Sequence, residues 1–178
     1  MQLPIGDWTI RSWRLDDAAA LAKYASNAAV WINLRDSFPF PYTKEDAGAW
    51  LGAVSMQVPE TAFAIASPQE AIGGIGLQFQ YDVYRKSAEL GYWLGEPFWR
   101  KGIATLAVQA ITVYAFRRFD LERIYAAVFG WNMASARVLE KAGYRLEGRF
   151  RNAVFKDGRI TDQLMYGIVR KDALGPGS

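Results

Sequence analysis

The amino-acid sequence predicts an α/β fold in which helices cover both faces of one mixed β-sheet. Strand–helix–strand patterns occupy the middle of the 178-residue chain, and β-hairpin patterns lie on either side of them. The segment 123–129 (RIYAAVF) is almost wholly apolar, as expected for a strand buried on both faces. A content of 51% hydrophobic and 22% charged residues is typical of a globular protein with a substantial core.

The individual elements follow from hydrophobic periodicity and from turn and capping residues. Thr43, followed by Asp46 three residues later, predicts a capping pair for a helix over 44–55. The turns SPQE and KDGR each predict a hairpin between two strands. In chain order, we expect an edge strand 7–13, helix 15–27, an irregular loop 34–46, helix 44–55, strands 61–66, 71–79 and 87–95, helix 100–118, strand 123–129, helix 132–143, and strands 144–155 and 161–170.

The domain organisation is predicted to be simple. Residues 1–172 contain no repeat or linker, so we expect one domain, followed by a disordered tail or cloning remnant at 173–178. No run approaches the roughly 18 apolar residues needed to span a bilayer, and the first residues lack the basic region of a signal peptide. These features favour a cytoplasmic protein. The β segments near the C-terminus could support a homodimer.

The absence of two residue types limits the chemistry. The chain has no cysteine, which excludes disulfides, thiolate nucleophiles and Cys-ligated metal sites. It also has no histidine, which excludes the Ser-His-Asp and Cys-His systems and His-bearing metal sites. The net charge of +3 is too small to indicate a nucleic-acid-binding protein by itself, although it suits an anionic small ligand.

An unusual charge pattern lies at the start of the predicted helix 100–118. Arg100 and Lys101 place cations where the helix dipole disfavours them, and Gly102 follows at once. A bound anion would explain all three residues, because unpaired N–H groups and a glycine allow an oxygen to approach the backbone. The alternative is that both side chains are solvated and the glycine is merely tolerated.

Two motifs resemble signatures of the GNAT superfamily of N-acetyltransferases, and within it the RimJ/RimL-like branch of ribosomal-protein alanine acetyltransferases. Residues 98–107 (FWRKGIATLA) resemble the pyrophosphate-binding motif Gln/Arg-x-x-Gly-x-Gly/Ala, with Trp99 replacing the Gln or Arg. Residues 132–144 (NMASARVLEKAGY) are similar to the signature Asn-x-x-Ser-x-x-x-Leu-Glu-Lys-x-Gly-Phe/Tyr. With the flanking segments, the resemblance covers nearly all of residues 8–172.

The resemblance implies a GNAT fold, a mostly antiparallel sheet that is splayed between two central parallel strands, here 87–95 and 123–129. It also implies acetyl-CoA as the cosubstrate and no metal. The pantetheine arm would bind the backbone of the first strand, and the diphosphate would bind the start of the helix that follows it. The implied cofactor-binding residues are Tyr92, Trp93, Leu94, Arg100, Lys101, Gly102, Ile103, Ala104, Thr105, Asn132 and Ser135.

Some of these residues also have purely structural interpretations. Asn132 is a good N-cap for the last predicted helix, and capping and cofactor contact can coexist in one loop. The resemblance implies that Ser135 lies near the thioester sulfur and could protonate the departing thiolate, whereas the sequence alone places it on an exposed helix face. Tyr144 is another candidate acid, but a tyrosine directly after KAG is more typical of the core.

Particular residues of the chain are candidates for the general base and for the acceptor site. An amine must lose its proton before it attacks the thioester, and Glu89 shares a strand face with Gly91 and Trp93 by alternation. Glu89 could therefore accept that proton, directly or through water, or it could simply point to solvent. The segments 34–46 and 80–87 would form the acceptor side or merely close the core, with Asp36, Phe38, Phe40 and Tyr84 as candidate substrate-binding residues.

The sequence thus favours direct transfer of the acetyl group from acetyl-CoA to a primary amine in a ternary complex, since no Cys or His could carry the group. The branch suggests a protein or peptide N-terminal amine as acceptor. A small amine, such as a polyamine, an aminoglycoside or an amino acid derivative, is the alternative within the same chemistry. A non-catalytic CoA-binding module is the alternative from another class, and neither a membrane nor a nucleic acid is expected as a partner.

Overall fold

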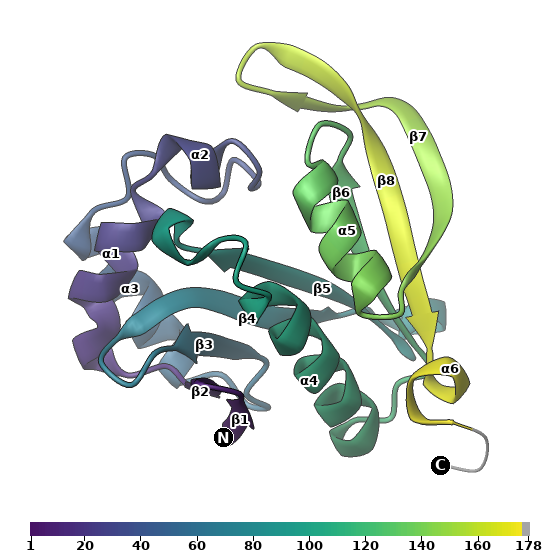
Figure 1. Ribbon diagram of the computed structural model, residues 1–178, viewed down its shortest axis with the longest axis horizontal. Helices are drawn as coiled ribbons and strands as arrows, with labels where there is room; N and C mark the ends of the chain where they lie inside the picture. The colour runs from purple at the N-terminus through teal and green to yellow at the C-terminus, as the bar shows by residue number, and fades with distance from the viewer. Residues whose placement is uncertain (176–178) are drawn as a thin grey trace. The chain divides into compact units, whose positions relative to one another are not determined.

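The computed structural model describes residues 1–175 of the chain (Figure 1). Its strands are β1 (Gln2–Ile5), β2 (Trp8–Ser12), β3 (Ala62–Ala66), β4 (Ala71–Phe79), β5 (Ser87–Leu94), β6 (Arg123–Phe129), β7 (Arg145–Lys156) and β8 (Arg159–Val169). Its α-helices are α1 (Ala18–Ala25), α2 (Ala28–Trp31), α3 (Lys44–Ser55), α4 (Ile103–Arg118), α5 (Met133–Lys141) and α6 (Arg170–Leu174). Short 3-10 helices η1 (Leu15–Asp17), η2 (Asp82–Tyr84) and η3 (Glu96–Phe98) lie in the connections.

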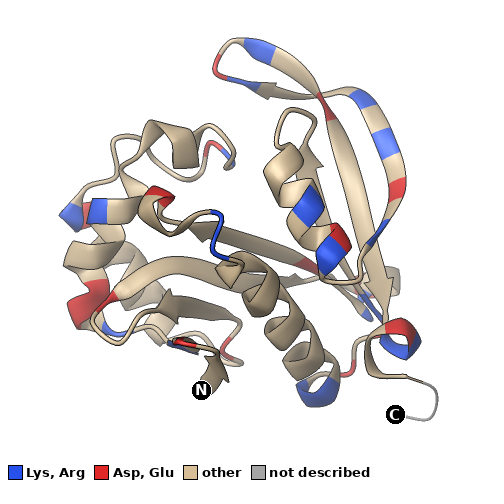
Figure 2. Ribbon diagram, viewed as in Figure 1, with Lys and Arg blue, Asp and Glu red and all other residues tan. Residues whose placement is uncertain are grey.

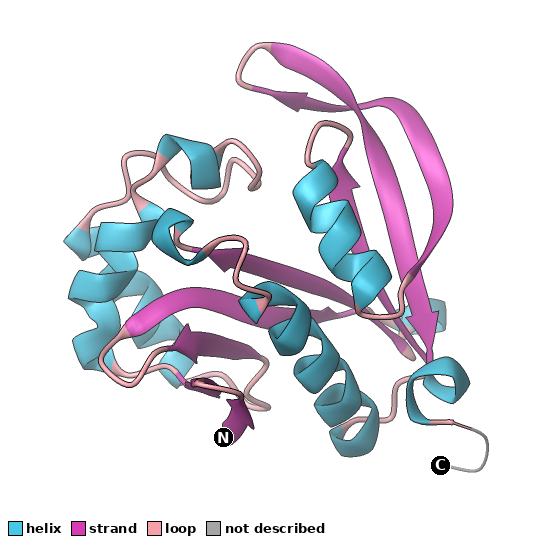
Figure 3. Cartoon of the chain, viewed as in Figure 1, coloured by secondary structure: helices cyan, strands magenta, loops and turns pink. Residues whose placement is uncertain are grey.

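The strands, drawn in magenta in Figure 3, form one eight-stranded mixed sheet. Their order in the sheet is β1-β2-β3-β4-β5-β6-β8-β7. The pairs β1–β2, β2–β3, β3–β4, β6–β8 and β7–β8 are antiparallel, whereas β5 and β6 run parallel. The parallel ladder joins only Ser87–Glu89 to Arg123–Tyr125, so the pairing covers the first residues of each strand. The predicted α/β fold with two central parallel strands is confirmed.

The chain divides into two compact units, and each is described by itself. Unit 1 comprises Met1–Gly76 and Tyr92–Ala107, and unit 2 comprises Leu77–Gly91 and the chain from Val108 onward. Both β5 and α4 therefore contribute residues to each unit. None of the helices described over residues 1–175 has the length and apolarity needed to cross a membrane.

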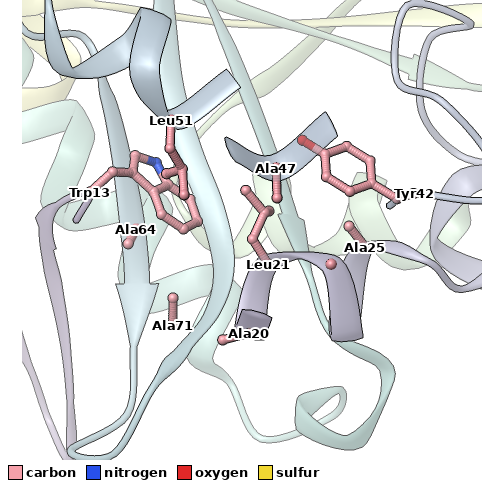
Figure 4. Close-up of a cluster of buried hydrophobic side chains, with 10 residues drawn as sticks. Trp13, Ala20, Leu21, Ala25, Tyr42, Ala47, Leu51, Ala64 and Ala71 are labelled. Atoms are coloured by element: carbon pink, nitrogen blue, oxygen red, sulfur yellow. The ribbon is translucent and has the colours of Figure 1, made fainter. Parts of the chain in front are cut away.

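The core of unit 1 lies where α1 and α3 pack with β3 and β4. Trp13, Leu21, Tyr42 and Leu51 are among its buried side chains (Figure 4). A Cβ atom on Gly74 would lie 2.8 Å from Nε1 of Trp93 and 3.2 Å from Cζ2 of Trp13. Glycine in β4 therefore allows two indole rings to pack directly on the strand.

The core of unit 2 includes a buried hydrogen bond between α4 and Tyr144, the residue before β7. The Thr112 hydroxyl donates to the Val108 carbonyl at 2.7 Å, and its oxygen is 2.7 Å from the Tyr144 hydroxyl. Because Thr112 uses its proton on Val108, the Tyr144 hydroxyl donates to Thr112. Tyr144 is only 3% exposed, which confirms its predicted position in the core.

The structure corrects the predicted strand and helix positions at several points. Strand 7–13 was predicted to be an edge strand, but β2 pairs with β3 on one side and with β1, which the sequence analysis missed, on the other. Helices α2 and α6 were also missed because each is short. In β6 the burial alternates, with only Ile124, Ala126 and Val128 fully buried, so the strand is not equally buried on both faces.

The two edges of the sheet are irregular or short. β1 has four residues, one of which is Pro4. β7 has twelve residues, but its pairing with β8 shifts register between Leu146 and Gly148 and again between Phe150 and Val154. The second shift is stabilised by Asp162, which accepts hydrogen bonds from the Asn152 backbone at 2.8 Å and from the Arg149 side chain.

The turn KDGR joins β7 to β8 as predicted, with positive φ at Asp157 and Gly158. The disorder predicted for the tail falls partly on residues 176–178, which lie outside the described chain.

Candidate functional site

Strand β5 presents two different faces along its length. Ala88, Leu90 and Leu94 are buried, whereas Glu89 and Trp93 on the alternate face are only partly covered. The alternation agrees with the predicted common face of Glu89 and Trp93. The strand therefore packs one face in the protein core, while Glu89 and Trp93 on the other face stay partly accessible.

The loop from Gly95 to Gly102, here called the anion loop, follows β5 in unit 1. It is fixed at its start, because the Gly95 N–H donates to the Ile72 carbonyl of β4 at 2.8 Å. The Trp99 indole N–H donates to the Leu94 carbonyl at 2.6 Å, and the Trp99 backbone N–H donates to the Glu96 carbonyl at 3.1 Å. Trp99, which replaces the Gln or Arg of the family motif, thus ties the loop back to the end of β5. In the sequence this residue is visible only as a departure from the motif, and its structural role was not predicted.

The backbone of the anion loop has a conformation suited to an anion. Arg100 has φ +63° and Gly102 has φ +79°, so two residues close together take the left-handed conformation. Alternation of this kind turns successive N–H groups toward one point and forms an anion-binding concavity. Helix α4 begins at Ile103, and the N–H groups of its first turn have no partner within the helix.

The two cations near the start of α4 belong to the loop and not to the helix. Arg100 and Lys101 were predicted to open the helix, but this is wrong, because both precede α4 and lie in the anion loop (Figure 2). Both side chains are exposed, as is Gly102. A Cβ atom on Gly102 would meet no atom within 4 Å, so the space above this backbone is open. The cations, the open glycine and the first turn of α4 together offer a site for a diphosphate.

The junction of α1 and α2, residues Tyr24 to Asn27, contacts the anion loop at three points. A Cβ atom on Gly95 would lie 2.9 Å from the Tyr24 ring, and the Tyr24 and Phe98 rings meet edge to face at 5.3 Å. The Asn27 amide donates to a carboxylate oxygen of Glu96 at 2.7 Å. Lys101 lies over the Phe98 ring at 5.4 Å. The conformation of the loop therefore depends on residues far away in sequence.

The segment 34–42 of unit 1 carries three of the four predicted acceptor residues. The Phe38 ring lies 4.8 Å from Tyr42 and 5.9 Å from Trp93, so it connects this segment to β5. Phe40 is 45% exposed and stacks on Trp31 of α2 at 5.2 Å. Asp36 is exposed at the start of the segment. These positions are compatible with an acceptor role for Asp36, Phe38 and Phe40, which stays a prediction.

Tyr42, by contrast, belongs to the core, where it is 6% exposed. Burial, with the negative charge of Asp46 as a smaller cause, raises the pKa of Tyr42 to about 12. Since the neutral phenol is favoured in the folded state, its contribution to stability is complete below a pH of about 10 and is lost as the pH rises through about 12.

This pKa predicts how stability depends on pH. Between pH 10 and pH 12, we expect the urea midpoint of the wild type to decrease more than that of the Tyr42→Phe variant. Tyr81→Phe, at an exposed tyrosine, is the control and should fall in parallel with the wild type; a parallel fall of Tyr42→Phe would contradict the expectation.

In unit 2, Glu89 occupies the last position of the parallel ladder, where its Cα pairs with that of Tyr125. Its side chain is partly exposed. Glu89 thus has an aromatic residue as its register partner on β6, at the point where the pairing of β5 and β6 stops. A carboxylate in this position can accept a proton from an amine that reaches it.

Also in unit 2, Asn132 and Ser135 lie together at the start of α5. The Asn132 side-chain oxygen accepts a hydrogen bond from the Ser135 N–H at 3.1 Å, which confirms the capping interpretation. The cap uses only the oxygen, and over residues 1–175 the Asn132 amide group has no acceptor. Capping therefore leaves the side-chain N–H groups of Asn132 available as donors. Ser135, the third residue of α5, is partly buried.

The remaining predicted acceptor residue, Tyr84, lies in η2 of unit 2 and is 69% exposed. Within unit 1 the structure joins Leu94 to the anion loop through Trp99, and Trp93 to Phe38. Within unit 2 it brings Asn132 together with Ser135. The Asn27–Glu96 pair was missed, and its one signal in the sequence was an asparagine before the short apolar run AAVW, which is a capping pattern.

Comparison with known proteins identifies the family. The profile of the acetyltransferase (GNAT) domain matches residues 8–145. The uncharacterized N-acetyltransferase p20 of Bacillus licheniformis is 30% identical over 173 residues, which cover 94% of this chain and 95% of p20. The ribosomal-protein-serine acetyltransferase of Escherichia coli is 31% identical over 107 residues, 60% of this chain and 59% of that enzyme.

The solved structures agree with this result. The complex of RimL, a ribosomal-protein acetyltransferase, with coenzyme A has a TM-score of 0.83, covers 95% of this chain and 98% of RimL, and is 23% identical, so this likeness shows the fold alone. The family profile and the near full-length match to p20 carry the assignment further. The chain belongs to the GNAT family of acetyltransferases, and ribosomal-protein acetyltransferases are among its relatives and structural neighbours.

Proposed function

We propose that this acetyltransferase uses acetyl-CoA and transfers its acetyl group to a primary amine, the N-terminal amine of a protein or peptide. The observation that carries the choice of donor is the anion loop, in which two positive φ angles, two exposed cations and an open glycine precede a helix N-terminus. The ribosomal-protein-serine acetyltransferase of Escherichia coli among the relatives supports the choice of acceptor.

The anion loop and the end of β5 would bind the donor. The N–H groups from Arg100 to Thr105 would donate to the diphosphate oxygens, and the side chains of Arg100 and Lys101 would add charge-assisted hydrogen bonds. The backbone of Tyr92, Trp93 and Leu94 would bind the pantetheine arm, as would the free amide group of Asn132. When bound, acetyl-CoA supplies an activated thioester, and these residues orient it.

Two side chains of unit 2 would transfer protons. Glu89 would accept the proton of the ammonium group, directly or through one water, because only the neutral amine is a nucleophile. The Ser135 hydroxyl would donate a proton to the departing thiolate, and the second proton that the nitrogen releases as the amide forms would restore the hydroxyl. The attack forms the C–N bond of the amide and breaks the C–S bond of the thioester, so no group on the protein is acylated.

The chain's lack of cysteine makes the test direct. A thiol reagent detects only the CoA thiol released from acetyl-CoA, since the protein contributes no thiol background. The assay should be run with peptides that differ in their N-terminal residue, with polyamines and with aminoglycosides. We expect peptide-dependent thiol release. Release that depends only on a small amine would overturn the acceptor class, and acetyl-CoA binding without release under any condition would indicate a non-catalytic CoA-binding module.

A further inference from the structure

The anion loop contains one charge of the wrong sign. Glu96 lies in η3, four residues before Arg100, and places a carboxylate in a loop whose other charged side chains are cations. Like charges close to a bound diphosphate weaken its binding. This carboxylate accepts a hydrogen bond in the structure. The side-chain amide of Asn27, 69 residues earlier in the sequence, donates to Glu96 Oε2 at 2.7 Å.

Both polar atoms of the Asn27 side chain make hydrogen bonds. Its side-chain oxygen accepts hydrogen bonds from the N–H groups of Ala29 at 2.8 Å and Val30 at 3.2 Å, and so caps α2. Its amide nitrogen is then oriented toward Glu96. The two ends of one short side chain therefore connect the N-terminus of α2 to the anion loop.

The surroundings make this connection rigid. On one side of Glu96, Phe98 packs edge to face on Tyr24, and on the other side Gly95 fits closely against the same ring. The Tyr24 hydroxyl in turn donates to Glu70 at 2.5 Å, so the ring cannot turn freely. The Asn27–Glu96 bond is the polar contact that completes this attachment of the loop to the α1–α2 junction.

We propose that Asn27, through Glu96, is a positioning residue for the donor: it holds the anion loop in the conformation that binds the diphosphate. This role rests on the proposed use of acetyl-CoA. Asn27 lies outside the anion loop and acts by fixing the backbone between Gly95 and Gly102. The effect of losing the bond therefore falls on binding of the diphosphate and leaves the proton transfers intact.

The chain allows capping to be separated from positioning. Aspartate caps a helix as well as asparagine does, but in Asn27→Asp the donor is lost and two carboxylates face each other. We expect the dissociation constant for acetyl-CoA, measured by calorimetry, to rise about fivefold to tenfold. The matched control is Gln69→Glu, which adds the same charge at an exposed turn of unit 1 and should bind acetyl-CoA like the wild type.

A reversed pair tests the geometry itself. In Asn27→Asp combined with Glu96→Gln, the glutamine amide can donate to the aspartate, the cap is kept, and the net charge equals that of the wild type. We expect acetyl-CoA affinity within about twofold of the wild-type value. Turnover of acetyl-pantetheine, which lacks the diphosphate, should fall less in Asn27→Asp than turnover of acetyl-CoA does.

The outcomes separate the two proposals. Wild-type affinity in Asn27→Asp, an equal loss with acetyl-pantetheine, or no recovery in the reversed pair would each overturn the positioning role while the wild type still binds acetyl-CoA. A wild-type protein that does not bind acetyl-CoA at all would contradict the proposed function, and the positioning role would fall with it.

Discussion

Replacement of Glu89 by glutamine is expected to lower kcat about a hundredfold or more while KM for acetyl-CoA changes less than about twofold, because a positioned general base contributes roughly 10²–10⁴ in rate. Glutamine has the same shape as glutamate but cannot accept the amine proton. Glu89 lies on β5 in the last pair of the parallel ladder, six residues before the anion loop, and is not among the proposed donor-binding residues, so donor binding should not depend on its charge. Initial rates from the thiol-release assay, with each substrate varied in turn, give both constants.

The pH dependence provides a second readout for the same variant. The α-amino group of a peptide has a pKa of about 8 in solution, so its neutral fraction grows as the pH rises from 7 to 9. The deficit of Glu89→Gln relative to the wild type should therefore shrink over this range. Glu45→Gln, an exposed glutamate in the first turn of α3, is the control and should retain wild-type rates. A deficit in Glu89→Gln that stays constant with pH, or none at all, would show that Glu89 is not the base.

Replacement of Gly102 by alanine should raise KM for acetyl-CoA about tenfold or more. The residue has φ +79°, where an alanine is strained by about 1 kcal/mol. In addition, the new methyl group would occupy the open space where the diphosphate is proposed to approach the backbone. The second effect acts on binding only, since no protein atom lies within 4 Å of that methyl position.

The chain contains a matched control for the strain. Gly158, in the turn between β7 and β8, has φ +71°, and a Cβ atom on this residue would likewise meet no atom within 4 Å. Gly158→Ala should therefore lose a similar amount of stability in urea unfolding but keep the wild-type KM. If both variants raise KM equally, the open space above Gly102 is not a ligand site, and the proposed diphosphate site would have to be abandoned.

The sequence was sufficient for the fold class and for the strand and helix patterns around β5, because period-two and helical spacing are local properties. The capping of α3 by Thr43 and of α5 by Asn132 was also readable, since a cap requires only residues close in sequence. The start of α4 was placed three residues too early. Nothing in the residue type of Arg100 indicates a positive φ, a conformation that non-glycine residues seldom adopt.

The contacts that shape the candidate site could not be read in the same way. Phe38 meets Trp93, and Asn27 meets Glu96, only after the chain has folded, and each pair joins distant parts of the sequence. The role of Tyr42 also depends on tertiary packing, since the same aromatic-rich segment contains the buried Tyr42 and the exposed Phe40. Periodicity is undefined in an irregular loop, so it could not distinguish these two residues.

The irregular margins of the sheet have a consequence for behaviour at high concentration. A long, regular outer strand exposes unpaired N–H and C=O groups on which another chain can add a strand and begin an ordered aggregate. Here one margin is the four-residue β1 with its proline, and the other is β7, whose two register shifts and arginines interrupt any continuous ladder. Neither margin offers a template of useful length. Strand addition is therefore disfavoured at both outer strands, at β1 by its length and its proline and at β7 by the register shifts that make its backbone irregular.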